Sequence, residues 1–207
     1  MTEKSAGLVV VDTGTANLAS MLAALKRLGQ SPELTSDPVA LAEARLAVLP
    51  GVGAFGQAMS RLAALGLEDA IRARIAEGRP LLCVCLGLQV LCTASEESPG
   101  IYGICAIDAR VRRFADRPGL VVPQLGWNLV APLADSRLIE PGYAYYANSY
   151  RLEAIPEGYT GATSDHGGQF VAALERGPLL ACQFHPELSG AYGHELLGRW
   201  LARARAC

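Results

Sequence analysis

Cys85 occupies a position in this 207-residue chain that suits a nucleophile. The apolar run at residues 81–84 is typical of a buried strand, and residues 85–89 (CLGLQ) begin a helix directly behind it. A side chain at such a sharp strand-to-helix turn is exposed and rigidly held, as in a nucleophile elbow. The helix N-terminus favours a thiolate, and the N–H of Leu86 faces the oxygen of a tetrahedral intermediate. On position alone, a buried apolar role for Cys85 fits equally well.

A cysteine nucleophile needs a general base, and His185 is the best placed of the three histidines. It follows the apolar run at residues 179–184, so a parallel sheet brings it to the same edge as Cys85. Glu187 comes two residues later on the same side of an extended segment, where its carboxylate can orient the imidazole. The other histidines lie in a turn-like stretch and on the predicted last helix, where we expect solvated side chains: His166 and His194.

A second feature is the glycine-rich turn at residues 49–55 (LPGVGAF), which follows another apolar run. The backbone N–H groups of Gly51, Val52 and Gly53 can bind an anion or an oxyanion. This pattern occurs in many α/β proteins and is not diagnostic by itself. Residues 12–17 (DTGTAN) lack both the lysine of a phosphate-binding loop and the three-glycine fingerprint, so we interpret them as a turn and a helix cap.

The elements that must position these residues alternate along the first half of the chain. The hydrophobic periodicity predicts strands at 7–11, 31–35, 46–49 and 81–84, and helices at 18–28, 39–45, 57–77 and 86–94. Strands separated by helices pair in parallel through right-handed crossovers. The predicted fold class is therefore α/β, a doubly wound, open, mainly parallel sheet of the flavodoxin-like kind.

Between residues 98 and 173 the pattern changes to short β-type runs with frequent proline and glycine, at 109–114, 143–150 and 170–174. These runs predict an antiparallel extension of the sheet. A strand at 179–184 and an amphipathic helix at 190–204 then complete the chain. No linker separates the two halves, so we expect a single domain over residues 1–207.

Composition excludes several classes of protein. The chain has 18 Lys and Arg against 20 Asp and Glu, a net charge of −2, which disfavours a nucleic-acid binder. The longest apolar stretch, residues 81–92, is shorter than the ~20 residues of a membrane-spanning helix. Residues 1–4 begin no signal region, so we expect a cytoplasmic protein. The six cysteines form neither a disulfide framework nor a metal-ligand pattern, so we expect no metal and no cofactor.

Four segments together resemble the class I (triad-type) glutamine amidotransferases. They are residues 49–55, residues 85–89, residues 122–128 (VPQLGWN) and residues 183–187 (QFHPE). Their order and spacing are most similar to those of the glutaminase subunits of imidazole glycerol phosphate synthase, which act in histidine biosynthesis. The resemblance covers nearly the whole chain, from Asp12 to the final helix.

The resemblance implies hydrolysis of L-glutamine to glutamate and ammonia. It assigns Cys85 as nucleophile, His185 as proton shuttle and Glu187 as the group that orients His185. The oxyanion hole would be formed by Leu86, Gly51, Val52 and Gly53, and the substrate would be bound by Gln89, Ser149 and Tyr150. The implied partner is a cyclase subunit with a (β/α)₈ barrel, which forms a heterodimer and receives the ammonia through a channel.

The sequence departs from the family pattern at four positions. Cys83 stands where the elbow usually has glycine, Gln124 and Asn148 each replace a histidine, and Leu188 replaces a lysine. The resemblance places the last three near the face that meets the cyclase. Three alternatives therefore stay open at this stage: a paralogue that supplies ammonia to a different synthase, a catalytically silent scaffold that activates a synthase, and a free-standing cysteine hydrolase.

Overall fold

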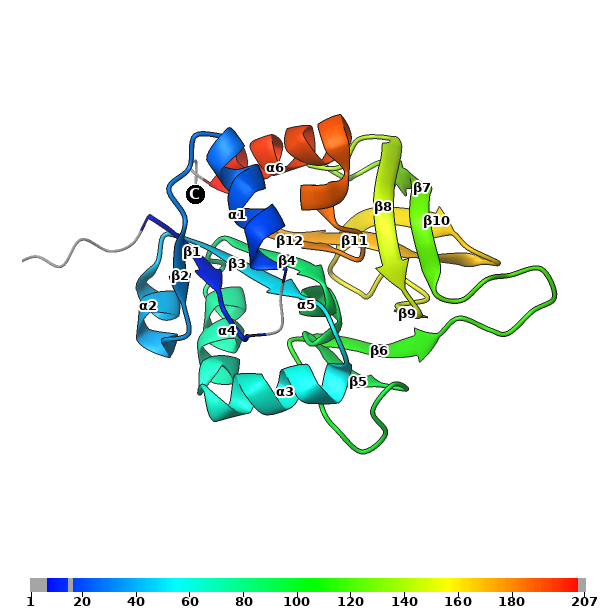
Figure 1. The fold of residues 1–207 in the computed structure, drawn as a ribbon, viewed down its shortest axis with the longest axis horizontal. Helices are drawn as coiled ribbons and strands as arrows, with labels where there is room; N and C mark the ends of the chain where they lie inside the picture. Colours follow the sequence, from blue (N-terminus) through cyan, green and yellow to red (C-terminus); the bar gives the residue numbers. More distant parts are fainter. Residues whose placement is uncertain (1–6, 15–16, 205–207) are drawn as a thin grey trace, which may run out of the picture.

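The computed structural model describes residues 7–14 and 17–204. Its main feature is a nine-stranded sheet with the order β2-β1-β3-β4-β12-β11-β10-β7-β8 (Figure 1). The first five strands in this order pair in parallel. They are β2 (Glu33–Thr35), β1 (Leu8–Val11), β3 (Leu46–Gly51), β4 (Leu81–Cys85) and β12 (Leu179–Cys182). Their side chains are mostly buried, as expected for strands covered on both faces.

The remaining four strands pair antiparallel and extend the sheet from β12. They are β11 (Gln169–Arg176), β10 (Thr160–Asp165), β7 (Gln124–Pro132) and β8 (Gly142–Asn148). The predicted doubly wound sheet with an antiparallel extension is therefore confirmed. Two of these strands, β7 and β10, were not expected as separate elements.

Helices cover both faces of the parallel half (Figure 1). On one face α1 (Leu18–Arg27) and α6 (Gly190–Ala204) pack over Leu8 and Val10, and on the other α2 (Pro38–Glu43) packs over Val9 and Val11. The alternation within β1 gives each face its own hydrophobic core, because successive strand side chains point to opposite sides. The final helix has the predicted bounds.

The predicted helix at residues 57–77 is two helices, α3 (Phe55–Ala64) and α4 (Leu67–Ala76). Gly66 has a φ of +66° and lies between them, a conformation that glycine adopts without strain. The amphipathic pattern continues across the break because both helices bury apolar side chains on the same side of the sheet. Periodicity alone therefore did not show the turn.

The predicted helix at residues 86–94 is also wrong in length. The helix α5 spans only Leu86–Gln89, and the chain then forms β5 (Cys92–Ser95). This strand belongs to a second, three-stranded sheet with β6 (Ile107–Arg113) and β9 (Tyr150–Arg151). The apolar residues of β5 and β6 pack beneath the main sheet, which explains why residues 90–94 are as hydrophobic as a helix face.

Within residues 7–14 and 17–204, no helix is long and apolar enough to cross a membrane. The cysteines at positions 83, 85, 92, 105 and 182 are free thiols, and Cys207 lies outside the described residues. The predicted turn at residues 12–17 includes positions 15 and 16, which also lie outside them. Asn17 precedes α1 as expected, but its side chain makes no capping hydrogen bond.

Candidate active site

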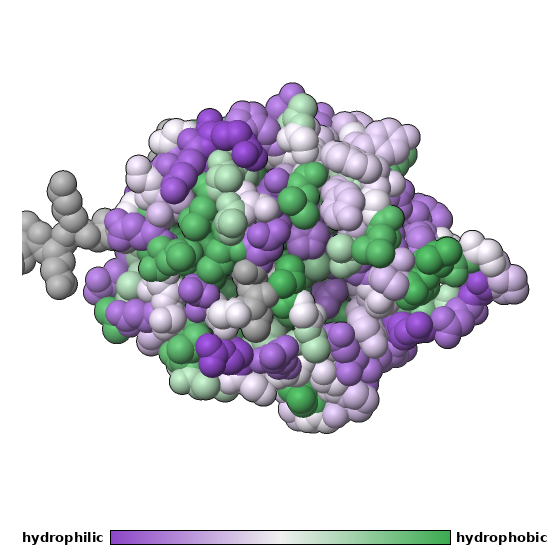
Figure 2. Space-filling view, viewed as in Figure 1, coloured by the Kyte–Doolittle hydropathy of each residue, from purple (hydrophilic) through white to green (hydrophobic). Residues whose placement is uncertain are grey.

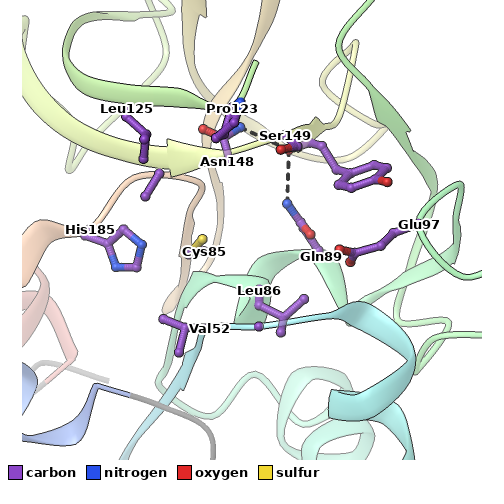
Figure 3. A pocket seen from close by; sticks show the side chains of 13 residues that line it. Val52, Cys85, Leu86, Gln89, Glu97, Pro123, Leu125, Asn148, Ser149 and His185 are labelled. Carbon is purple, nitrogen blue, oxygen red and sulfur yellow. Dashed lines mark hydrogen bonds between the residues drawn. The ribbon is translucent and has the colours of Figure 1, made fainter. Parts of the chain in front are cut away.

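A cavity of about 280 Å³ opens at the carboxyl ends of the central parallel strands. Its walls come from the ends of β3 and β4, from α5, and from the segments around β8 and β12 (Figure 3). The lining residues are Val52, Gly53, Cys85, Leu86, Gln89, Glu97, Pro123, Leu125, Ala147, Asn148, Ser149, Tyr150 and His185. This is the edge at which ligands bind in open α/β sheets.

Cys85 ends β4 and has a φ of 54° and a ψ of −108°, values that are strained for a residue with a Cβ. This backbone turns the strand into α5 and presents the sulfur to the cavity. Backbone segments meet closely behind it: a Cβ on Gly87 would lie 2.2 Å from the carbonyl oxygen of Leu49. A Cβ on Gly51 would lie 2.8 Å from the amide nitrogen of Gly87. The absence of side chains at these two glycines therefore allows the sharp turn.

The helix behind the elbow is shorter than the sequence predicts, at four residues. A helix of about one turn has few aligned peptide dipoles, so it stabilises a thiolate less than the expected helix would. Other groups must supply most of the stabilisation of a sulfur anion at Cys85.

His185 lies across the cavity from α5, with its ring directed toward the sulfur of Cys85 (Figure 3). Its Nδ1 is 2.9 Å from Oε1 of Glu187, and the two side chains are only 6% and 4% exposed. Because Nδ1 faces the carboxylate, Nε2 is the ring nitrogen available to Cys85. Burial lowers the pKa of His185, but the interactions with Cys85 and Glu187 outweigh it and raise this pKa to about 10.

The backbone of His185 is anchored to the antiparallel half of the sheet. Its N–H donates to the carbonyl of Tyr145 in β8 at 2.9 Å, and its carbonyl accepts from the hydroxyl of Ser189 at 2.6 Å. The same hydroxyl oxygen accepts from the N–H of Tyr145 at 2.9 Å. The imidazole is therefore fixed through its backbone as well as through Glu187.

Only part of the glycine-rich segment at the end of β3 lines the cavity. Val52 and Gly53 line the cavity, and Gly53 has a φ of +101°, a conformation that favours glycine. Gly51 does not line it, because it is the last residue of β3 and pairs with Cys85. Leu86, another residue of the predicted oxyanion hole, lines the cavity beside Val52 (Figure 3).

The three residues expected to bind substrate all line the cavity: Gln89, Ser149 and Tyr150. Gln89 is held by a hydrogen bond from its Nε2 to the carbonyl of Tyr150 at 3.1 Å. A second bond from the same nitrogen reaches Oε1 of Gln183 at 3.0 Å. Gln183 belongs to the segment 183–187 selected from the sequence, but no role was assigned to it there, because the sequence gives no sign of the contacts of its amide.

Glu97 is a further lining residue that the sequence did not reveal. One of its carboxylate oxygens accepts the N–H of Phe55 at 2.7 Å, at the start of α3. It therefore fixes the entry to α3 directly after the glycine-rich segment, and an acid at a helix N-terminus is favourable. Only its position in residues 93–99 (TASEESP), a polar stretch after an apolar run, could have drawn attention to it.

The other two histidines lie apart from this cavity. His166 is half-buried against the ring of Phe114, and its Nε2 lies 2.9 Å from the carbonyl oxygen of Val121. His194 is exposed on α6, as predicted. Among the described histidines, His185 is the one that lines the cavity with Cys85.

A family model described as glutamine amidotransferase class-I matches residues 9–204, which include the whole cavity. The chain belongs to the class I glutamine amidotransferases. Among its relatives, the "Imidazole glycerol phosphate synthase subunit HisH" of Symbiobacterium thermophilum is 42% identical over 199 residues, with 94% of this chain and 93% of the relative covered. The protein of the same name from Methanothermobacter thermautotrophicus is 41% identical over 202 residues, covering 96% and 100%.

Solved structures agree with the fold of this amidotransferase. A crystal structure of a glutamine amidotransferase matches it with a TM-score of 0.75 at 21% identity, covering 96% of this chain and 100% of the other. A second glutamine amidotransferase, from Thermotoga maritima, gives a TM-score of 0.65 at 16% identity, covering 99% and 84%. At such low identities these matches concern the fold alone.

Three of the four departures from the family pattern are buried in this amidotransferase. Cys83 lies within β4 and pairs with Leu49 and Ala181, so its side chain enters a core and the turn itself is at Cys85. Gln124 and Asn148 pair with each other across β7 and β8, each 5% exposed. Only Leu188 is exposed. Gln124 and Asn148 therefore point inward between the strands, and their nearness to the face that meets the cyclase stays a prediction.

Proposed function

We propose that this chain is the glutaminase subunit of an imidazole glycerol phosphate synthase, acting in histidine biosynthesis. It hydrolyses L-glutamine to glutamate and ammonia with residues 1–207 as one amidotransferase domain in the cytoplasm. The observation that carries the proposal is the placement of His185, braced by Glu187, across one cavity from Cys85 at a strained elbow. Relatives with the subunit's name match nearly the full chain.

The reaction begins with attack of the Cys85 sulfur on the side-chain carboxamide carbon of glutamine. A carbon–sulfur bond forms, and the carbonyl oxygen becomes an oxyanion. His185, protonated on Nε2, transfers this proton to the nitrogen, and the carbon–nitrogen bond breaks to release ammonia. Water then attacks the thioester and passes a proton to His185, and glutamate leaves as the sulfur is regenerated.

The oxyanion is bound by backbone N–H groups. In this proposal the N–H of Leu86 is one donor and the segment Gly51, Val52 and Gly53 supplies the other. One such donor contributes about 10²–10³ in rate, so a segment that must first reorient keeps turnover low. The half-exposed Val52 and the positive φ of Gly53 support such a reorientation, since glycine accepts both signs of φ. Binding of the partner's ligand would complete the site.

The amino-acid end of glutamine is bound at the opposite side of the cavity from His185. Gln89, Ser149 and Tyr150 provide polar groups there, and Glu97 provides a carboxylate suited to the α-ammonium group. An ammonium group close to a carboxylate is strongly favoured in a desolvated cavity. In this proposal the carboxamide of glutamine lies between Cys85 and Leu86.

The cyclase partner, a (β/α)₈ barrel, docks on the outer face of β7 and β8. Residues on this face are unusually exposed for apolar side chains: Leu125 67%, Trp127 57%, Leu129 46% and Tyr143 60%. Figure 2 shows a few hydrophobic side chains among pale, weakly polar ones over this part of the molecule. Leu125 and Ala147 also line the cavity, so the docking face surrounds its mouth and the ammonia passes directly into the partner. A contiguous exposed apolar face is typical of an interaction site.

A mixing experiment tests the proposal. The purified chain, combined with a cyclase subunit and the cyclase's ligand, is expected to release glutamate from glutamine. The variant Cys85→Ala should release none, with an unchanged unfolding temperature as the control for folding. Release of glutamate by the variant at the wild-type rate would overturn the assignment of the nucleophile, and release that does not respond to the cyclase would overturn the assignment of the partner.

A further inference from the structure

Gln183 is completely buried and lies between the sulfur of Cys85 and the side chain of Gln89. Its Nε2 is 3.6 Å from Sγ of Cys85, and its Oε1 is 3.0 Å from Nε2 of Gln89. Its backbone is fixed as well, since its N–H donates to the carbonyl of Ala172 at 2.8 Å. Both the nitrogen and the oxygen of the Gln183 amide are therefore hydrogen-bonded within the protein.

The direction of these hydrogen bonds is determined by one backbone carbonyl. The oxygen of Tyr150 can only accept, and it lies 3.1 Å from Nε2 of Gln89 and 3.0 Å from Nδ2 of Asn148. Gln89 must therefore present its NH₂ group to this side, and the same NH₂ group donates to Oε1 of Gln183. If the Gln183 amide were flipped, its NH₂ group would face the NH₂ group of Gln89, and neither could accept a hydrogen bond. The NH₂ group of Gln183 must therefore face the sulfur of Cys85.

A hydrogen-bond donor beside a sulfur stabilises the thiolate more than the thiol. His185 is the charged partner of this sulfur, and α5 is too short to add a large dipole, so a neutral donor supplies further stabilisation. We infer that Gln183 is a positioning residue that holds the sulfur of Cys85 as a hydrogen-bond acceptor and favours its thiolate form. The inference rests on the proposed role of Cys85 as nucleophile.

The charged and titratable groups around the sulfur show why a neutral donor is suited to this position. His185 faces it from the segment after β12, with Glu187 behind the ring, and Glu97 lies on the cavity wall. A cation at position 183 would lie close to the imidazole of His185 and would lower the pKa of His185 by repulsion. The amide of Gln183 adds stabilisation of the thiolate without changing the net charge of the site.

The test measures the ionisation of Cys85 directly. The rate of alkylation of Cys85 by iodoacetamide is followed against pH in the full chain, with the modified residue identified by peptide mass spectrometry. Gln183→Met keeps the size of the side chain and removes the donor. We expect alkylation of Cys85 near neutral pH to slow at least about tenfold, the effect of losing a hydrogen bond to a charged group.

The matched control is Gln124→Met, which replaces another buried amide that makes no hydrogen bond to Cys85 in the described structure. It should leave the alkylation profile unchanged. An unshifted profile in folded Gln183→Met, or an equal shift in Gln124→Met, would overturn the inference. Because alkylation does not depend on glutamine turnover, either result is distinguishable from a failure of the proposed glutaminase activity.

A second measurement uses the wild-type chain and therefore does not depend on how the variants fold. The side-chain amide protons of Gln183 are followed by ¹⁵N-resolved NMR while the pH is changed. We expect their chemical shifts to follow the same pH dependence as the alkylation rate of Cys85, and to lose this response after Cys85 is alkylated. An amide signal that does not follow the ionisation of the thiol would show that the contact has no role in it.

Discussion

Nδ1 of His185 lies 2.9 Å from Oε1 of Glu187, and both side chains are almost completely buried. A surface ion pair contributes little, but a pair removed from water interacts strongly and is costly to break. The second carboxylate oxygen of Glu187 has no hydrogen-bond partner in the described structure, so the imidazole is the main compensation for this buried charge. The contact therefore connects the protonation of His185 to the stability of the fold.

The first prediction concerns how this contact depends on pH. Burial lowers the pKa of His185, while Cys85 and Glu187 raise it to a net value of about 10, above the ~6.5 of an unfolded chain. The folded protein therefore binds the proton more tightly. The stabilisation of the fold by protonated His185 is fully present below about pH 6.5 and is lost as the pH rises through about 10. We expect Glu187→Gln to destabilise the protein most near pH 6 and least near pH 10.

Urea unfolding at a series of pH values measures this difference. The matched control is Glu195→Gln on α6. The carboxylate of Glu195 is exposed, and its contact with Arg199 is long, at 4.0 Å. This variant should change the free energy of unfolding little at any of these pH values. A destabilisation by Glu187→Gln that is constant from pH 6 to pH 10 would contradict the linkage.

The second prediction concerns the close backbone contact behind the elbow. In Gly87→Ala the new Cβ would lie 2.2 Å from the carbonyl oxygen of Leu49, a backbone atom that cannot move without displacing β3. We expect a loss of more than about 2 kcal/mol in the free energy of unfolding. Gly198→Ala is the control, because its Cβ would meet only a side-chain atom of Leu28 at 3.7 Å. Equal unfolding temperatures for Gly87→Ala and Gly198→Ala would show that the elbow tolerates a side chain at position 87.

The third prediction concerns Cys83, which departs from the family pattern. Its side chain is completely buried, and burial raises the pKa of its thiol well above the usual value, so it remains neutral. Cys83→Ala should cost about 1 kcal/mol in the free energy of unfolding, and Cys83→Gly about 2 kcal/mol because glycine adds backbone entropy. Glutaminase turnover at a temperature where both variants are folded should change less than about threefold. A large loss of turnover with unchanged stability would assign Cys83 a role in the reaction.

The fourth prediction concerns the outer face of β7 and β8. Trp127→Ala removes an exposed aromatic side chain, which should weaken binding of the cyclase subunit at least about tenfold while leaving the unfolding temperature unchanged. Leu34→Ala is the control, since Leu34 is also exposed but lies in β2, at the other end of the nine-stranded sheet. Titration calorimetry measures both affinities. Equal affinities for wild type and Trp127→Ala would mean that the cyclase binds elsewhere.

The parallel half of the fold was predictable because its strands are short, apolar and separated by turn residues. The errors have local physical causes. Gly66 breaks a continuous amphipathic pattern, and residues 90–94 are apolar because they pack beneath the sheet and not because they continue a helix. In the antiparallel half, β7 alternates buried Gln124 with exposed Leu125, which reverses the usual polarity of the two faces and concealed the strand.

Of the site, the sequence could identify side chains that follow strands, such as Cys85 and His185, because topology places strand ends together. It could not identify Glu97, which reaches the cavity from the loop after β5 in the second sheet. Nor could it assign a role to Gln183 within the segment 183–187, because its contacts with Gln89 and Cys85 depend on the orientation of the amides. Hydrogen-bond networks of this kind depend on three-dimensional distances that spacing along the chain does not encode.

The most direct test of the account is to trap the covalent intermediate. The chain, assembled with its cyclase and the cyclase's ligand, is mixed with glutamine, quenched in acid within a turnover, and digested for mass spectrometry with fragment localisation. The account predicts a γ-glutamyl group bound as a thioester to Cys85, absent when glutamine is omitted. A glutamyl group on any other residue, or turnover with no adduct at Cys85 under conditions in which the thioester is stable, would contradict it.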